Sequence, residues 1–372
     1  MHVYCDTDPL QQVMLGTWFL PEYFDSVKNA RIREPLKQIA HETHEDLENF
    51  AFQLRLHGVE VYRPVTPTGL FDSENIVRPV INVRDTMRII GTTMYKFVSR
   101  SPEYDTALES CIGSFVDLTD ILAKANQDAK LLPKYSKEKY ELLCGSDWPS
   151  FEDYCANTYT IDNSIQTEID SYKTSIEYES LNTPEAPCIF VTDQEIIVDH
   201  HEYVNFTQVL SEHIKTDKIW RSINTHAGHT DGCFNLINPT TIIGIGELID
   251  RCVPEYRNQI RVTWDNFQGH VKEFNEHKKR VNGRWWIPGQ ENNDELTTFI
   301  EHYLGHLVGH VEETQFDLNV LCLDHNTTFV TGNSKDIRKL KDYSIDAIPI
   351  QWRHRWFHDG GLHCITLDLL RR

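Results

Sequence analysis

Short apolar segments alternate with longer segments of helical period along this chain. Residues 11–15 are typical of a strand that ends at Gly16. Over residues 35–57, apolar side chains recur at three- and four-residue steps, which predicts an amphipathic helix with one buried face. Gly58 favours termination of that helix, and residues 59–63 predict a second strand.

Pairs of apolar strands recur through the rest of the sequence, separated by segments of helical character. The predicted pairs are 80–84 with 87–91, 188–191 with 195–198, 234–237 with 241–244, 318–323 with 328–331, and 345–351 with 362–370. Repeated strand–strand–helix units predict a pseudo-symmetric α/β fold. Residues 126–173 fit the pattern poorly and predict an elaborated connection, and residues 265–313 predict an insertion with its own helices. No linker divides the chain, so we expect one domain over residues 1–372.

Composition and charge narrow the class of protein. The 372 residues are 40% apolar, which is sufficient for a full globular core. The formal net charge of −20 argues against a nucleic-acid partner, because phosphate binding requires clustered Lys and Arg. No apolar run long enough to span a membrane occurs, so no membrane partner is expected. Nine cysteines without a C-x-x-C pair, and an N-terminus without leader character, predict a cytoplasmic protein.

The residues near the C-terminus predict a nucleophile. A Gly360-Gly361 pair allows a tight backbone approach just before Cys364, and an apolar alternating segment follows. We expect Cys364 at the start of the closing strand, with His363 on the opposite face in a structural role. His229 and Asp231, two residues apart, supply the imidazole and carboxylate that a nucleophilic thiol requires.

Five segments, in order along the chain, together resemble the amidinotransferase family, in particular the glycine amidinotransferases, and more broadly the pentein superfamily of guanidine-modifying enzymes. They are the D-P-L-x-x-V-x-x-G segment at 8–16, the R-D pair at 84–85, the H-x-D-x-x-F-N segment at 229–235, the N-V-L-x-L-D segment at 319–324, and the G-G-x-H-C segment at 360–364. The resemblance implies a five-bladed α/β propeller with the active site on its central axis, and no cofactor or metal.

The resemblance also implies roles for individual residues. Asp85 and Asp231 would clamp the arginine guanidinium through paired N–H bonds. Cys364 would attack the guanidino carbon, and His229 would serve as general acid and then general base. Glu179 would orient His229.

Other residues carry less certain matches to the family pattern. Glu177 is an alternative to Glu179, because the match is offset in that region. Arg251 is expected to hold a substrate carboxylate, although it too is offset. Asp317 replaces a residue that is often Ser, and could bind an amine, and Asn319 completes the predicted substrate-binding set.

The resemblance therefore implies transfer of the amidino group of L-arginine to an amine, through an amidino-cysteine intermediate, with release of ornithine. The acceptor stays open, as does homo-oligomer formation. An arginine or agmatine deiminase on the same scaffold is the alternative enzyme, and a non-catalytic binding protein is the alternative from another class. His302, His306 and His310 recur at four-residue steps, which suits either a metal site or a polar helix face.

Overall fold

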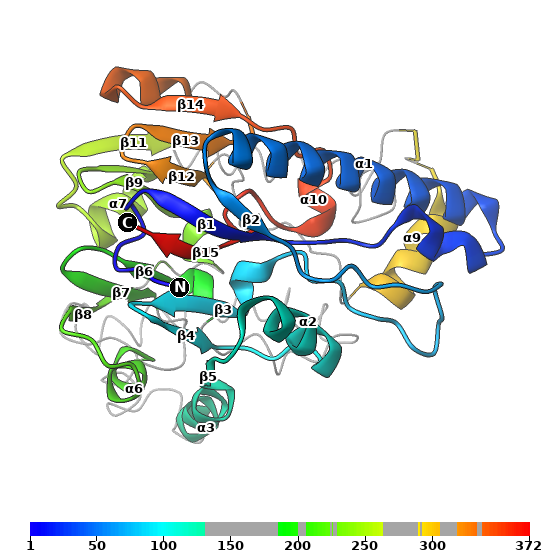
Figure 1. Cartoon of the computed structure of the whole chain (residues 1–372), viewed down its shortest axis with the longest axis horizontal. Coiled ribbons are helices and arrows are strands. Elements are labelled where there is room, and N and C mark those ends of the chain that lie inside the picture. The colour runs from blue at the N-terminus through cyan, green and yellow to red at the C-terminus, as the bar shows by residue number, and fades with distance from the viewer. Residues whose placement is uncertain are drawn as a thin grey trace, which may run out of the picture.

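The computed structural model describes residues 1–130, 185–199, 206–223, 225, 229–262, 289–290, 292–305, 318–332 and 337–372. These residues form five three-stranded sheets with helices around them (Figure 1). The sheets are β15 (Thr366–Arg371)–β1 (Leu10–Leu15)–β2 (Glu60–Tyr62), β3 (Met87–Ile90)–β4 (Thr93–Lys96)–β5 (Val116–Asp117), β6 (Ile189–Val191)–β7 (Glu195–Asp199)–β8 (Ile219–Ile223), β9 (Phe234–Asn238)–β10 (Thr241–Ile245)–β11 (Asn258–Val262), and β12 (Leu321–Asp324)–β13 (Thr327–Val330)–β14 (Asp346–Pro349).

All five sheets share one topology. The first two strands pair antiparallel, and the middle strand pairs in parallel with the third. The β15–β1–β2 sheet is built from both ends of the chain, so β15 and β1 lie side by side and the two termini are close together (Figure 1). The predicted α/β class is confirmed, and five repeated units are present; their closure into a propeller stays a prediction.

Two predicted strand pairs are wrong. Residues Val83–Asp85 form a 3-10 helix, η2, instead of a strand, and the hairpin of that sheet is β3–β4. The expected pairing of 345–351 with 362–370 also fails, because β14 pairs with β13 while β15 pairs with β1. An apolar alternating pattern identifies a strand but not its partner, which depends on contacts between distant residues.

The long helix α1 (Ala30–Leu56) begins five residues before its predicted start. Asn29 caps it by accepting a hydrogen bond from the backbone N–H of Arg31 at 3.0 Å. Pro35 lies inside the helix and lacks the N–H that would bond to the carbonyl of Arg31. The side-chain amide of Asn293 donates to that carbonyl instead, at 2.6 Å, so a residue of the predicted insertion satisfies the group that proline leaves free.

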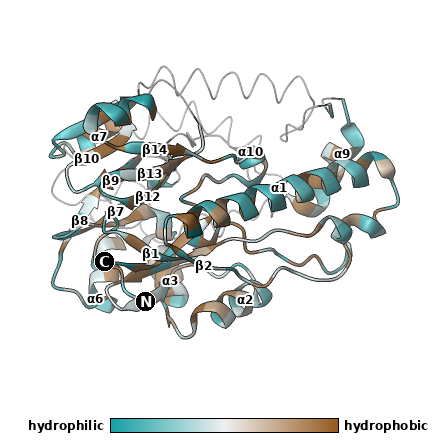
Figure 2. Ribbon diagram, turned by 45° about the horizontal axis from the view of Figure 1, so that its top comes forward, coloured by the Kyte–Doolittle hydropathy of each residue, from teal (hydrophilic) through white to brown (hydrophobic). Residues whose placement is uncertain are grey.

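The remaining helices surround the sheets and bury their apolar faces (Figure 2). They are η1 (Pro21–Ser26), α2 (Pro102–Ile112), α3 (Thr119–Lys130), η5 (Ala186–Cys188), α6 (Phe206–His213), η6 (Thr230–Gly232), α7 (Gly246–Cys252), α9 (Asp294–Phe299), η7 (Ile300–Leu304), η8 (Ile337–Tyr343) and α10 (Arg355–His358). Of the predicted insertion, α9 and η7 are described and are helical as expected. Among the helices of the described ranges, none has the length and apolar character needed to cross a bilayer.

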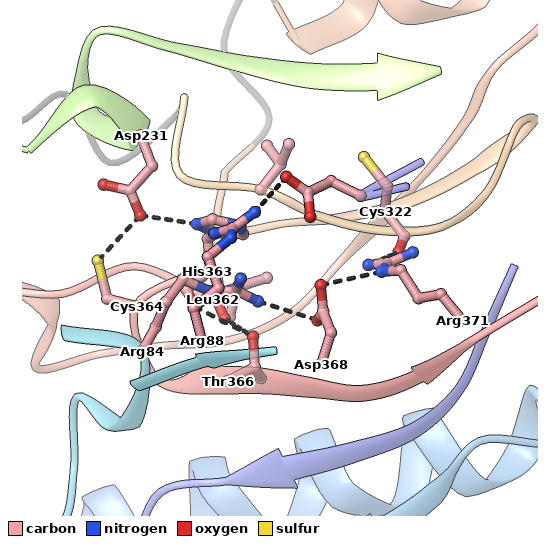
Figure 3. Close-up of polar contacts among 12 residues, drawn as sticks. Arg84, Arg88, Asp231, Cys322, Leu362, His363, Cys364, Thr366, Asp368 and Arg371 are labelled. Carbon is pink, nitrogen blue, oxygen red and sulfur yellow. Dashed lines mark hydrogen bonds and ion pairs between the residues drawn. The ribbon is translucent and has the colours of Figure 1, made fainter. Parts of the chain in front are cut away.

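A buried ion network joins the closing strand β15 to η2, β12 and the N-terminal segment (Figure 3). Asp368 of β15 accepts from Arg84 of η2 and from Arg371, both at 2.9 Å, and all three side chains are at most 4% exposed. Arg371 also donates to the backbone carbonyls of Asp8 and Cys322. The network therefore ties the N-terminal segment and β12 to the closing strand.

Asp368→Asn is expected to lower the free energy of unfolding by about 3–5 kcal/mol, because it leaves two buried guanidinium groups without their counter-charge. Chemical denaturation followed by circular dichroism measures this change. Asp250→Asn is the matched control: Asp250 also pairs with an arginine, Arg261, but both side chains are about half exposed, and the cost should be below about 1 kcal/mol. Equal costs for the two variants would contradict the structural importance of the central network.

A buried histidine lies in the short helix α10, just before the predicted nucleophile. His358 is 1% exposed, its Nε2 lies 2.9 Å from Thr43 Oγ1, and its ring stacks on Trp352 with centroids 5.2 Å apart. Burial, with a smaller effect of nearby His354, holds the pKa of His358 well below its usual value. The folded protein therefore keeps this imidazole neutral.

The stability of the protein should consequently fall as the pH drops below about 6.5, where His358 of the unfolded chain takes up a proton and that of the folded chain does not. The slope contributed by this one group is at most about 1.4 kcal/mol per pH unit. His358→Gln should reduce the slope measured by denaturation at several pH values, whereas His213→Gln, at an exposed position on α6, should leave it unchanged. An unaltered slope in His358→Gln would disprove the assignment.

Candidate active site

The predicted nucleophile, Cys364, lies in a turn over residues 362–365, immediately before β15. Neighbouring side chains explain the glycine pair that precedes it. A Cβ atom on Gly360 would lie 2.4 Å from Asn82 Oδ1, and one on Gly361 would lie 2.6 Å from the Asn319 side chain. The two glycines are thus required for close approach, and neither has a positive φ.

Asn319 holds the turn that carries Cys364. Its Oδ1 accepts from the backbone N–H groups of His363 and Cys364 at 2.9 and 3.0 Å. Its Nδ2 donates to Cys364 Sγ at 3.1 Å. Arg84 supports the same turn, because its Nε donates to the carbonyl of His363 at 2.8 Å and its backbone N–H donates to that of Cys364. The Asn319 amide, predicted to bind substrate, is thus engaged with the turn itself.

Asp231 lies between the side chains of His363 and Cys364 (Figure 3). His363 Nδ1 lies 2.7 Å from Asp231 Oδ2, and Cys364 Sγ lies 3.7 Å from the same oxygen. The prediction that His363 and Cys364 face opposite sides is wrong, because the two residues belong to a turn, where the alternation of a strand does not apply. Burial raises the pKa of Asp231, but the hydrogen bond and charge of His363, together with the charges of His229 and Arg84, lower that pKa overall.

His229 joins the thiol to a second carboxylate. It precedes η6, forms a hydrogen bond with Cys364, and places Nε2 3.0 Å from Glu185 Oε2. Glu185 is 6% exposed and directly precedes η5, which leads into β6. Sequence reasoning missed Glu185 because it sought the carboxylate in the segment 179–182. Glu185 lies only three residues before Cys188, and this position just before a buried strand could have identified it.

Asp85 and Arg100 complete this part of the site. Arg100 Nη2 lies 2.7 and 2.8 Å from the two oxygens of Glu185, and 3.9 Å from Asp85 Oδ2. Burial raises the pKa of Asp85 to about 7, with the charge of His229 acting in the opposite direction. Asp85, Glu185 and His229 each bring one potential ligand atom within 4.8 Å of the others. Arg100, which the sequence did not single out, already supplies a cation to the two carboxylates.

Two buried carboxylate oxygens in this site have no hydrogen-bond partner among the described residues. They are Oδ1 of Asp85 and Oδ1 of Asp231. A buried acceptor without a donor is costly, so each oxygen favours a ligand that donates hydrogen bonds. A planar cation with several N–H groups, such as a guanidinium, meets that requirement.

The structure describes only some of the other predicted site residues. Arg251 Nη2 donates to the carbonyl of Thr225 at 3.0 Å, which occupies part of its guanidinium. Asp317, Glu179 and Glu177 lie outside the described residues, and so do His306 and His310. His302 lies in η7 with its ring centroid 4.4 Å from that of Tyr303. Its predicted alternatives, metal ligand or polar helix face, therefore stay open.

The surroundings of Cys364 determine the protonation states of its thiol and of the His229 imidazole. Burial raises the pKa of Cys364 to about 12, the charges of Asp231 and Asp85 act in the same direction, and His229 opposes them. Burial lowers the pKa of His229, but hydrogen bonds to Cys364 and Glu185 and the charges of Glu185 and Asp85 raise it well above its usual value. At neutral pH the site therefore holds an imidazolium beside a neutral thiol.

Glu185→Gln should lower the pKa of His229, since it removes a hydrogen-bonded negative charge from Nε2. A titration of the labelled imidazole by NMR measures the change. Any turnover that uses His229 as acid and base should fall by roughly 10²–10⁴-fold in this variant. Glu195→Gln is a suitable control, because Glu195 of β7 pairs with Arg221 of the neighbouring strand β8. An unchanged pKa of His229 in Glu185→Gln would contradict the assigned pairing.

Comparison with known proteins bears on the fold. No protein-family model matches the sequence, and the search of curated proteins found no match. The chain is similar to an inosamine-phosphate amidinotransferase from Streptomyces griseus, with a TM-score of 0.57 and 14% identity, covering 100% of this chain and 96% of that one. It is also similar to an amidinotransferase from Microseira wollei in the saxitoxin biosynthetic pathway, with a TM-score of 0.54 and 16% identity, covering 100% and 97%. The fold of this chain is thus similar to the fold of these two amidinotransferases.

Proposed function

We propose that this protein is an amidinotransferase that moves the amidino group of L-arginine to an amine acceptor through a covalent intermediate on Cys364. The observation that carries the proposal is the contact of one buried thiol with both an imidazole and a carboxylate that has an oxygen free for a donor. This arrangement suits nucleophilic attack on the carbon of a cationic, planar group.

Substrate binding and thiol activation are coupled in this proposal. The guanidinium donates N–H groups to the free oxygens of Asp85 and Asp231. Its positive charge offsets the two negative charges that contribute to the raised pKa of Cys364. The thiol then loses its proton to solvent, and the thiolate is stabilised by the His229 imidazolium and by the Asn319 amide at 3.1 Å.

The chemistry proceeds in two halves that balance in atoms and protons. The Cys364 thiolate attacks the guanidino carbon, and His229 gives its proton to the departing amine as the C–N bond breaks, releasing ornithine. The amidino group is then held on sulfur. In the second half the neutral His229 takes a proton from the incoming amine, which bonds to the amidino carbon, and the Cys364 thiolate leaves.

Each remaining residue has a stated part in this scheme. Glu185 takes the role predicted for Glu179, keeping His229 oriented and protonated for the first half. Asn319 and Arg84 position the turn that carries Cys364. Arg251 and Asp317 stay candidates for the outer part of the substrate. We infer a single catalytic domain over residues 1–372. We also infer that it works in a reducing, cytoplasmic environment, since every cysteine of the described residues is a free thiol.

Incubation with L-arginine, with and without a panel of amines that includes glycine, tests the function. Ornithine that forms only with an amine, together with a new guanidino product, is the expected result. Citrulline formed without an amine would mean that water takes the place of the acceptor, as in a deiminase. Absence of both products would favour a binding protein, or a different guanidino donor.

Cys364→Ala should abolish turnover, because in the proposed mechanism the Cys364 sulfur carries the amidino intermediate. Mass spectrometry of the wild-type protein, incubated with arginine but no acceptor, should locate an amidino adduct on the peptide that contains Cys364. Cys252→Ala is the control, since Cys252 is also buried but lies on α7, and it should keep turnover within a few-fold of the wild type. Activity retained in Cys364→Ala would refute the covalent mechanism.

A further inference from the structure

We propose that Asp199 is a positioning residue for His229, because it is hydrogen-bonded to Thr225 and Thr230, which lie on either side of this histidine in the sequence. The proposal rests on the proposed function, in which His229 is the acid and base. Asp199 is the last residue of β7 and lies in none of the five segments that carry the family resemblance.

The carboxylate of Asp199 accepts three hydrogen bonds from two threonines. Its Oδ1 accepts from the backbone N–H of Thr225 at 3.0 Å, and its Oδ2 accepts from the hydroxyl of Thr225 at 2.5 Å. The same Oδ2 accepts from the hydroxyl of Thr230 at 2.7 Å. Asp199 is 1% exposed, and the two threonines are 3% and 0% exposed, so these are charge-assisted bonds shielded from water.

These contacts bracket His229 in the chain. Thr230 follows it directly and begins η6, whose next residue is Asp231. Thr225 is four residues before it, and its carbonyl is held in turn by Arg251 at 3.0 Å. Asp199 of β7 therefore holds one residue on each side of His229, and Arg251 of α7 holds one of the two. Within η6, the carbonyl of His229 accepts from the N–H of Gly232 at 3.0 Å, which extends the anchoring to His229 itself.

Side-chain contacts alone would not hold the imidazole in place as firmly. The side chain of His229 is 29% exposed, whereas the side chain of its partner Glu185 is only 8% exposed. Its ring must meet Cys364 on one side and Glu185 on the other, and these come from other parts of the chain. A misplacement of about 1 Å can cost about 10²-fold in rate. Asp199 sets the position of His229 through Thr225 and Thr230, and this position decides whether both contacts form.

The test measures the reactivity of Cys364 rather than turnover alone. The rate of alkylation by iodoacetamide is followed on the Cys364 peptide by mass spectrometry, from neutral to alkaline pH. His229→Asn defines the rate without the imidazole. Asp199→Ala removes both carboxylate oxygens, and with them the three hydrogen bonds from Thr225 and Thr230, and should bring the pH profile of alkylation close to that of His229→Asn. Asp199→Asn retains an acceptor for the Thr225 N–H and should give an intermediate profile.

Two controls separate positioning from loss of structure. Asp6→Asn changes another buried carboxylate, which binds Arg88 and the backbone of Val191, and should keep the wild-type profile. Alkylation of Cys322, a buried thiol of β12, reports general opening in the same sample. If Asp199→Ala does not fold, Thr230→Val removes one hydroxyl with little change in shape and should shift the profile in the same direction.

Kinetics then distinguish the two proposals. With arginine and an amine, Asp199→Ala should lower kcat by roughly 10²-fold and change KM for arginine much less, because the variant keeps the carboxylates of Asp85 and Asp231. A wild-type alkylation profile in Asp199→Ala and Thr230→Val would overturn the positioning role even if transfer is demonstrated. Absence of any guanidino turnover in the wild type would refute the proposed function, while the alkylation series would still decide the role of Asp199.

Discussion

The buried carboxylate of Asp368, held between Arg84 and Arg371, is the interaction on which the arrangement of this molecule depends. Arg371 reaches the backbone of the N-terminal segment and of β12, and Arg84 reaches the turn that carries Cys364. Asp85 follows Arg84 in the same short helix and faces the site. Three ionised groups without access to water are stable only together, so the network fixes the closing strand, the turn and Asp85 relative to one another.

The site itself is an excess of negative charge arranged around one thiol. Asp85, Glu185 and Asp231 are all buried, while Arg100 and the His229 imidazolium supply the positive charge. Arg100 is committed mainly to Glu185, and Asp85 and Asp231 each keep an oxygen to which no group of the described residues donates. A cation that donates several hydrogen bonds would complete this arrangement. The negative charges that attract this cation also help to keep the Cys364 thiol protonated until the cation binds. This would limit the side reactions of a free thiolate.

Much of the local structure followed from the sequence, because it depends on residues near one another in the chain. The apolar period of residues 35–57 predicted most of α1, and three of the strand pairs were identified correctly. The errors arose where distant groups intervene. The start of α1 moved because Asn293, far along the chain, satisfies the carbonyl that Pro35 leaves free. Residues 345–351 and 362–370 were wrongly paired because β15 finds its partner in β1, at the other end of the chain.

The sequence by itself determined the chemical inventory: a cysteine after a glycine pair, a histidine and an aspartate two residues apart, and an R-D pair, in an order that resembles one family. Only the tertiary structure decided which groups meet. It brought Glu185, 44 residues away, to His229 and placed Asp231, 133 residues away, beside Cys364. It turned His363 toward the same aspartate as Cys364 and assigned Asp199 to the loop of His229. Hydrogen bonds act over about 3 Å, and the chain positions of two residues do not specify whether the fold brings them within that distance.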